Sequence, residues 1–402
     1  MVVGQFSQDV DVLVIGGGPA GYTAAFRAAE LGKTVAIVDP NETLGGDCLY
    51  HACIPSKTSL LSVDSSSAIA SLGKGLEQRC KTLDIERLFG VAHFENKKTA
   101  QITGEVVSVV KFRKAIIATG SQQRVNEAYP NAMQVEELYA TQFKDKTILI
   151  VGDTPSAIEA ATFASNNNTV SLWLNGEFLP SFERQLVKVV QRTLSKCVLI
   201  CSEQPDISTY DCIFLADHRL PKTKSLQLEN ANVHCEDGFI VTDDSCKTSN
   251  PKIYAIGECS GCHHNAALAI TQGRVAGEDS CGLDAHVDAM FIPKVAWSSP
   301  EIAQVGKFDK ENTVAIRWGN SGLAVALGQQ MGLTMLSYEK ESQAIIGIGI
   351  VGAGAIEMIS EGTLALEMGA TLYDLATTVR PHPTRSELLS EAARVALSSF
   401  DN

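Results

Sequence analysis

The fold of this chain is indicated first by residues 11–21, which read DVLVIGGGPAG. Residues 11–15 predict a buried parallel strand, and the alanine-rich residues 22–31 predict a helix that begins directly after the glycine turn. A second strand is expected at residues 34–38 and ends at Asp39, about 20 residues after the first glycine. This G-x-G-x-x-G pattern in a strand–turn–helix setting is typical of a dinucleotide-binding fold.

Each position of this fingerprint meets a separate physical need. Gly16 permits the tight turn, Gly18 lets the backbone approach a pyrophosphate, and Gly21 allows the helix to pack closely. The N-terminus of the helix would hold the phosphates, while Asp39 can accept hydrogen bonds from ribose hydroxyls. We therefore predict a bound nucleotide at this turn.

A pair of cysteines follows the fingerprint, in residues 45–57, GGDCLYHACIPSK. In a regular helix, residues spaced like Cys48 and Cys53 lie roughly 8–9 Å apart. A disulfide tolerates at most about 7 Å between Cα atoms, so one cysteine would have to lie in an irregular turn, with a helix starting near the second. A helix N-terminus lowers a thiol pKa and makes the thiol reactive. The spacing alone fits two ordinary buried cysteines equally well, but its position after a nucleotide fingerprint favours a redox-active disulfide.

The composition indicates an ordinary globular protein of two or three domains, with 402 residues, 45% hydrophobic and 20% charged. The net charge of −13 argues against a nucleic acid partner and against a basic membrane-binding patch. No apolar run reaches the length of a membrane span, and residues 1–10 resemble neither a signal peptide nor a transit peptide. Eleven cysteines without an export signal predict a reducing, cytoplasmic location, in which a disulfide is more often catalytic than structural.

A second strand–turn–helix unit is expected further along the chain, at residues 146–173, with Gly152 in its turn. Buried strands that end in small residues are expected at 114–121 and 250–257. Strands and then helices fill residues 314–397. The two strand–turn–helix units point to duplication of a nucleotide-binding fold within one chain.

The C-terminal region carries RPHPTRSE at residues 380–387. The flanking prolines fix the backbone of His382, and Glu387 can orient its ring and raise its basicity, as in a base–orienter pair. Taken alone, the simpler interpretation is a surface histidine before a helix N-terminus and a solvated glutamate.

Taken together, these motifs resemble the pyridine nucleotide–disulfide oxidoreductases, most closely the dihydrolipoamide dehydrogenase group. The resemblance rests on GGxCx4CIPSK, then ATGS at 118–121, IYAIG at 253–257 and HPTxSE at 382–387. Residues 295–306 and 350–376 also look like the C-terminal domain of that family, so nearly the whole chain is covered. The resemblance implies an α/β fold with two Rossmann-like nucleotide-binding domains, of the FAD and NAD type, and a C-terminal α+β dimerisation domain.

The resemblance also implies domains, a reaction and partners. The FAD-binding domain would take residues 1–145 and 250–288, a shortened NAD-binding-like domain 146–249, and the dimerisation domain 289–402. The reaction would oxidise dihydrolipoamide through a redox disulfide and FAD, with NAD+ as final acceptor. The partners would be a second copy of the chain that shares both active sites, a small dithiol or lipoylated carrier protein, and a 2-oxoacid dehydrogenase-type complex.

Residue roles follow from the same resemblance. Cys53 would form the thiolate that faces the flavin, and Cys48 would exchange with the substrate thiol. His382 of the second subunit would act as base, oriented by Glu387, because only thiolates attack disulfides. No metal site is expected. FAD would be bound by Gly16, Gly18, Pro19, Ala20, Gly21, Asp39, Pro40, Gly46, Lys57, Thr119, Gly120, Gly257, Glu258 and Ala266.

The second nucleotide unit departs from the family, which places G-x-G-x-x-G-x-E there for NAD. Gly152 and Glu159 match this pattern, but Thr154 stands where the backbone should approach the pyrophosphate. Asp153 adds negative charge, and Trp173 aligns with the expected ribose-binding acid. Three alternatives stay open: NAD binds weakly, the flavin uses a quinone, oxygen or a redox protein instead, or the chain is a non-catalytic scaffold flavoprotein. A scaffold has no physical need for the cysteine pair and the His–Glu pair together.

Residues 259–263, CSGCH, match the attachment pattern of c-type haem. Haem is disfavoured because the chain has no export signal and because the family resemblance places this loop against the flavin. The remaining interpretations are an extra Cys259–Cys262 dithiol near the flavin, or two unpaired loop cysteines.

Overall fold

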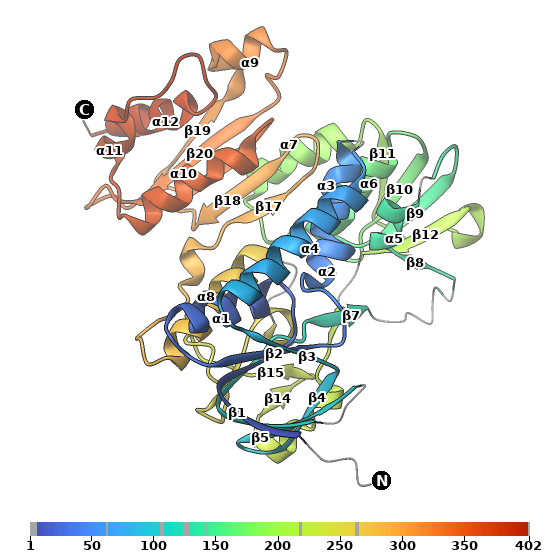
Figure 1. Ribbon diagram of the computed structural model, residues 1–402. Helices are drawn as coiled ribbons and strands as arrows, with labels where there is room; N and C mark the ends of the chain where they lie inside the picture. Colours follow the sequence, from blue (N-terminus) through green and yellow to red (C-terminus); the bar gives the residue numbers. More distant parts are fainter. Residues whose placement is uncertain are drawn as a thin grey trace. The chain divides into compact units, whose positions relative to one another are not determined.

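The computed structural model describes residues 6–61, 63–104, 108–123, 129, 131–141, 143–216, 219–261 and 265–400. It divides into two compact units, each built from two separate stretches of the chain (Figure 1). The first unit contains residues 1–125 and 218–288, and the second contains residues 126–217 and 289–402.

The first unit is built on one large sheet in the order β3-β2-β1-β6-β5-β4, with β16 also paired to β6. Strands β3, β2, β1, β6 and β16 run parallel, and β4 and β5 add antiparallel pairs at the other end of β6. The strands are β1 (Phe6–Ile15), β2 (Val35–Asp39), β3 (Glu86–Phe89), β4 (Val91–Asn96), β5 (Thr99–Thr103), β6 (Ser108–Ile117) and β16 (Ile253–Ala255). Two small pairs join β7 (Ser121–Gln123) to β13 (Arg219–Pro221) and β14 (Cys235–Glu236) to β15 (Phe239–Ile240).

Both faces of this sheet are buried, as expected for parallel strands. Because side chains alternate along a strand, Val12 and Val14 of β1 pack with the helices on one face. Leu13 and Ile15 belong to the cluster on the other face, which includes residues of β4, β5 and the 224–231 turns. Helices α1 and α8 lie side by side (Figure 1), and a Cβ at Gly273 would be 2.4 Å from the Ala20 carbonyl oxygen. The unit contains α1 (Pro19–Glu30), α2 (Gly46–Tyr50), α3 (Cys53–Leu60), α4 (Ser65–Thr82), α8 (Ala266–Ser280), η2 (Lys224–Leu226), η3 (Leu228–Ala231) and η4 (Gly257–Ser260).

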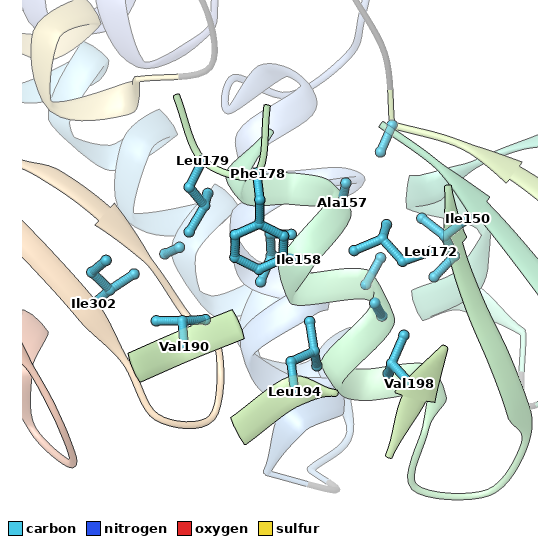
Figure 2. Packing of buried hydrophobic residues seen from close by; sticks show 14 of the residues in the cluster. Ile150, Ala157, Ile158, Leu172, Phe178, Leu179, Val190, Leu194, Val198 and Ile302 are labelled. Atoms are coloured by element: carbon cyan, nitrogen blue, oxygen red, sulfur yellow. The ribbon is translucent and has the colours of Figure 1, made fainter. Parts of the chain in front are cut away.

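The second unit holds a five-stranded parallel sheet in the order β11-β10-β9-β12-β8. Figure 2 shows its core, in which Ala157 and Ile158 of helix α6 pack beside Val190 and Leu194 of helix α7. The elements are β8 (Met133–Gln134), β9 (Thr147–Val151), β10 (Thr169–Trp173), β11 (Val198–Cys201), β12 (Cys212–Leu215), α5 (Val135–Ala140), α6 (Pro155–Ala164), α7 (Arg184–Leu194) and η1 (Ile207–Thr209).

The same unit contains an antiparallel sheet in the order β17-β18-β21-β20-β19. Its core includes the fully buried Trp318, whose indole Nε1 donates to Thr334 Oγ1 at 3.0 Å. Ile302 of β18 belongs to the core of the parallel sheet (Figure 2), so the two sheets of this unit share buried side chains. The elements are β17 (Lys294–Ala296), β18 (Ile302–Gly306), β19 (Thr313–Arg317), β20 (Leu333–Tyr338), β21 (Ile345–Val351), α9 (Gly322–Ala326), α10 (Ala355–Glu367), α11 (Leu372–Thr377), α12 (Glu387–Leu397), η5 (Ala289–Phe291) and η6 (Trp318–Asn320).

The predicted fold class is confirmed: two parallel nucleotide-type folds and a C-terminal α+β part are present. The packing divides the chain at 125/126, 217/218 and 288/289, and the division into three domains at 145/146, 249/250 and 288/289 stays a prediction. The first two boundaries of the packing follow from strand pairing, because β13 pairs with β7 in the first unit and β8 pairs with β12 in the second. Among the described residues, no helix is both long and apolar enough to cross a bilayer.

Candidate active site

The glycine turn between β1 and α1 leaves room for a phosphate group. A Cβ at Gly16 (φ +112°) would be 2.2 Å from the Ala118 carbonyl oxygen, and one at Gly21 would be 1.9 Å from the Gly16 carbonyl oxygen. At Gly18 a Cβ would meet only the Gly46 Cα, at 3.9 Å. Protein packing thus requires glycine at positions 16 and 21, whereas Gly18 borders open space. Gly18 is also the N-cap of α1 and supplies no side-chain cap, so the N-terminal N–H groups of the helix face that space.

Asp39 is held at the same turn. It ends β2, is only 7% exposed, and its Oδ2 accepts a hydrogen bond from the Gly17 N–H at 2.6 Å. Its Oδ1 accepts from the Asn41 N–H and side-chain amide, both at 2.8 Å. The carboxylate is therefore oriented beside the turn, in the position where the sequence predicted a ribose contact.

Several other predicted FAD ligands lie at one edge of the large sheet, whereas Gly46 begins α2 and Lys57 lies in α3. Ile15, Ile117 and Ala255 are in register at the ends of β1, β6 and β16. The predicted glycines follow directly, so Gly120 (φ +69°) and Gly257 (φ +72°) come to the same edge as the first glycine turn. The carboxyl edge of a parallel sheet is the usual ligand-binding edge of such folds. Thr119, Glu258 and Ala266, the first residue of α8, stand in the same connections.

The cysteine segment is joined to the glycine turn. The Gly45 N–H donates to the Gly17 carbonyl at 2.9 Å, and a Cβ at Gly46 (φ +56°) would be 2.8 Å from the Gly18 Cα. Only glycine allows both this torsion and this approach. The helix α2 that begins at Gly46 therefore starts beside the predicted pyrophosphate position.

Cys48 lies in α2, and Cys53 is the first residue of α3. The helix start at Cys53 agrees with the sequence prediction. The irregular turn, however, contains neither cysteine, because the chain breaks at His51 and Ala52, whose ψ angles are −29° and −88°. This break brings the two side chains together, and Cys48 donates a hydrogen bond to Cys53.

The two cysteines differ in their surroundings. The hydrogen bond to Cys53 raises the pKa of Cys48 most, followed by burial and by the negative charge of Cys53, while Lys57 on α3 lowers it. Cys53 begins α3, where the helix dipole stabilises a thiolate. The pKa of the Tyr22 phenol on α1 is raised, first by burial and then by the nearby charges of Cys48 and Cys53. Both cysteines are half-buried thiols in this structure.

A partly buried arginine links the cysteine segment to Ser121 and Glu258, which follow β6 and β16. Arg219 Nη2 donates to Asp47 Oδ2 at 2.6 Å, and its Nε donates to Ser121 Oγ at 2.7 Å. The Ser121 hydroxyl in turn donates to the Glu258 carboxylate, which lies 3.7 Å from Arg219 Nε. Arg219 was missed by the sequence analysis, because no local pattern distinguishes it from other arginines.

In the second unit, the two residues of the predicted base–orienter pair are in contact. His382 Nδ1 lies 2.8 Å from Glu387 Oε1, and Glu387 Oε2 accepts from the Thr384 N–H at 2.8 Å. The hydrogen bond from His382, and then that from Thr384, holds the pKa of Glu387 below its ordinary value. The His382 side chain is 81% exposed, so its Nε2 faces outward from the pair.

Two arginines that were missed by the sequence analysis hold the loop of His382. Arg380 is 5% exposed and donates to the Leu375 carbonyl at 2.9 Å and to the Thr378 carbonyl at 3.1 Å. It also bonds the Glu361 carboxylate and the Ser390 hydroxyl. Arg385 bonds the side-chain oxygen of Gln329. The exposed imidazole therefore stands on a loop that is anchored on both sides.

The remaining sequence candidates are placed as follows. Gly152 (φ +145°) makes the turn after β9, and a Cβ there would be 2.7 Å from the Ala216 carbonyl oxygen. Glu159 of α6 accepts a hydrogen bond from the Trp297 N–H at 2.9 Å.

Cys259 is fully buried, and burial raises its pKa. Its proposed dithiol partner Cys262 and the following histidines lie outside the described residues. Within the described ranges, no cluster of His, Cys, Asp and Glu could hold a metal ion.

Comparison with known proteins adds to this geometry. A family model described as pyridine nucleotide-disulphide oxidoreductase matches residues 10–201 and 195–273, and the dimerisation-domain model of that family matches residues 292–393. The chain is 32% identical to the dihydrolipoyl dehydrogenase of Bacillus subtilis (strain 168), with 99% of both chains covered. It is also 32% identical to that of Geobacillus stearothermophilus, with 99% and 98% covered. A solved structure, the HOCl-induced flavoprotein disulfide reductase RclA from Escherichia coli, has a TM-score of 0.85 at 21% identity, with 96% of this chain and 99% of that chain covered, a likeness of fold.

Proposed function

The chain belongs to the pyridine nucleotide–disulphide oxidoreductase family, and from this premise we propose that it is an FAD-dependent oxidoreductase that oxidises a dihydrolipoamide-type dithiol. The observation that carries the proposal is the Cys48–Cys53 pair, two thiols in hydrogen-bond contact beside an open phosphate cradle. A dithiol substrate matches this pair chemically, because thiol–disulfide exchange conserves the number of sulfur–sulfur bonds.

FAD fits the residues that are present. Its pyrophosphate would lie over Gly18 at the uncapped N-terminus of α1, and its ribose hydroxyls would meet the oriented carboxylate of Asp39. Thr119, Gly120 and Glu258 would line the same sheet edge. When bound, FAD supplies a ring system that accepts two electrons from the reduced cysteine pair.

The dithiol reaction can be written in two exchange steps. A substrate thiolate attacks the Cys48 sulfur of the oxidised pair, the bond to Cys53 breaks, and Cys53 leaves as a thiolate. The second substrate thiol then loses its proton and attacks, as a thiolate, the substrate sulfur of the mixed disulfide; the bond to Cys48 breaks, and Cys48 leaves and takes up that proton. The substrate ends as a cyclic disulfide, and the enzyme ends with a Cys48 thiol and a Cys53 thiolate. Two electrons have moved from the substrate to the cysteine pair.

The local geometry supports this division of labour between the cysteines. The raised pKa of Cys48 favours its protonated form, and the hydrogen bond that it donates stabilises a thiolate at Cys53. The N-terminus of α3 adds a favourable field at Cys53. Cys53 is therefore the better leaving group, and Cys48 is the better partner for the substrate.

The first substrate thiol must lose its proton, and His382 is the proposed base. Glu387 binds Nδ1, so Nε2 can take the proton, and the carboxylate stabilises the imidazolium that forms. The match to the dimerisation-domain model supports a homodimer in which His382 of one copy serves the cysteines of the other. The relatives named dihydrolipoyl dehydrogenase support dihydrolipoamide, free or on a carrier protein of a 2-oxoacid dehydrogenase-type complex, as the dithiol.

The experiment is an anaerobic titration of the purified holoenzyme with dihydrolipoamide, followed by flavin absorbance. The wild-type spectrum should change at stoichiometric dithiol, and Cys48→Ser should abolish this change while FAD stays bound. Cys197→Ser is the matched control, because Cys197 is an exposed cysteine of the second unit with no role in the reaction. Full flavin reduction by dihydrolipoamide in the Cys48→Ser protein would refute the proposal.

A further inference from the structure

The second nucleotide fold has the same turn as the first, but its helix begins differently. Gly152 makes the tight turn after β9, as Gly16 does after β1. A Cβ at Gly16 would clash with the Ala118 carbonyl after β6, and one at Gly152 with the Ala216 carbonyl after β12. In the first fold the N-cap of α1 is Gly18, with no side-chain cap. In the second fold the N-cap of α6 is Thr154, whose Oγ1 accepts from the Ala157 N–H at 3.4 Å and donates to the Ala216 carbonyl at 3.0 Å.

The Thr154 side chain therefore stands where a pyrophosphate would have to lie. A helix N-terminus binds phosphate through N–H groups that have no internal partner. Here the Thr154 hydroxyl accepts a hydrogen bond from one of these groups, the Ala157 N–H. The same hydroxyl is held in place by the hydrogen bond that it donates to the Ala216 carbonyl, directly after β12. A phosphate would have to displace the Thr154 hydroxyl, which would lose its hydrogen bonds to the Ala157 N–H and the Ala216 carbonyl.

A negative charge stands next to this cap. The Asp153 carboxylate lies against Gly176, because a Cβ built on Gly176 would be 2.2 Å from Asp153 Oδ2. The Asp153 carbonyl accepts a hydrogen bond from the Leu179 N–H at 3.3 Å, which ties this residue to the 176–179 loop. The space beside the Thr154 cap is therefore bordered by an acidic side chain, where the first fold has Gly17.

The ribose end of the site is filled by aromatic rings. Trp173 ends β10, at the position that Asp39 occupies at the end of β2, and its ring centroid lies 6.2 Å from that of Tyr129. Tyr129 is 5% exposed and packs with Leu149 and Leu215, so this corner is part of a hydrophobic cluster. An indole carries no acceptor for ribose hydroxyls.

The helix that would bind the dinucleotide is instead attached to the C-terminal sheet. Glu159 of α6 accepts the N–H of Trp297, directly after β17, at 2.9 Å. Ala157 and Ile158 of the same helix are fully buried in the cluster that also contains Ile302 of β18 (Figure 2). Helix α6 thus has a structural role that does not depend on a bound nucleotide.

We propose that the second nucleotide fold of this chain is closed to pyridine dinucleotides, by the Thr154 cap at the pyrophosphate position and by the Trp173–Tyr129 pair at the ribose position. This departs from our expectation of NAD+ as the final acceptor, and assigns the fold a supporting role for the C-terminal sheet. The inference rests on the proposed function in one respect: flavin reduction by dihydrolipoamide is the reference with which the nucleotides are compared.

The test is binding of NADH and NADPH to the anaerobic holoenzyme, measured by calorimetry and, in parallel, by flavin absorbance. We expect no saturable binding and no flavin reduction up to millimolar nucleotide, whereas dihydrolipoamide reduces the flavin. Saturable binding of either nucleotide at any concentration up to millimolar, or flavin reduction by it, would overturn the proposal. The isotherm does not depend on turnover, so failure of dihydrolipoamide to reduce the flavin would count against the proposed function alone.

Two double variants test the assignment to Thr154 and Trp173. T154G/W173E removes the cap and restores an acid, and it should show saturable NADH binding with a dissociation constant at least about tenfold below the millimolar limit set for the wild type. T154S/W173F keeps the hydroxyl and an aromatic ring, and it should stay closed. Flavin content and melting temperature report whether each variant is folded. A folded T154G/W173E protein without any gain in NADH binding would overturn the assignment of closure to these two residues.

Discussion

Replacing Gly18 or Gly21 with alanine should have opposite consequences, although both glycines belong to one fingerprint. A Cβ at Gly21 would be 1.9 Å from the Gly16 carbonyl oxygen, so the helix and the turn must separate by more than about 1 Å. Overpacking of this kind costs about 3 kcal/mol, and the better helix propensity of alanine offsets about 1 kcal/mol of it. The free energy of unfolding of the first unit should therefore fall by about 2 kcal/mol, which lowers its melting temperature by about 4–8 °C.

At Gly18 the same methyl group meets only the Gly46 Cα, at 3.9 Å, and φ is −74°, which alanine adopts without strain. Gly18→Ala should therefore lower the unfolding free energy of the apoprotein by less than about 1 kcal/mol. The methyl group would instead fill the space proposed for the pyrophosphate, so FAD affinity should fall by at least about tenfold.

The assay measures both variants twice, by thermal unfolding of the apoprotein and by FAD titration of the refolded apoprotein. The melting temperature of the apoprotein reports how well the protein itself packs around each position. The FAD titration reports the affinity of the turn for the pyrophosphate. If Gly18→Ala binds FAD like the wild type, or destabilises the apoprotein as much as Gly21→Ala does, the space above Gly18 is not the pyrophosphate site.

Three further outcomes are expected. His382→Gln should slow the dithiol half-reaction by about 10²-fold or more in stopped-flow measurements, with flavin content unchanged, because an amide cannot take a proton at neutral pH. Because the pKa of Glu387 is lowered in the folded protein, its pairing with His382 is present above the ordinary glutamate range and is lost as pH falls through that lowered pKa. The ring signals of His382 in NMR titrations should therefore respond as pH falls below the ordinary glutamate range in the wild type and not in Glu387→Gln. Arg219→Met should cost about 2 kcal/mol of unfolding free energy in denaturant titrations, because the 12%-exposed guanidinium bonds Asp47 and Ser121. An unchanged denaturation midpoint would show that this link does not stabilise the first unit.

The amino-acid sequence alone determined the features that depend on local backbone and side-chain chemistry. The glycine turn, the helix start at Cys53 and the His382–Glu387 pair were all predicted, because each requires particular residue types within a few positions. The two nucleotide-binding folds followed from the strand–turn–helix pattern, which repeats at Gly152, whereas the C-terminal domain was expected from the family resemblance alone.

Only the tertiary structure decided the features that join distant parts of the chain. Arg219 bonds Asp47 across 172 residues, the strand pairing moves residues 219–249 into the first unit, and the hydroxyl of Thr154 reaches the Ala216 carbonyl. The sequence showed that Thr154 and Trp173 are unusual, but not that one caps its own helix and the other packs on Tyr129. Such contacts depend on how strands pair and helices pack, and residues far apart in the sequence carry no local pattern that specifies them.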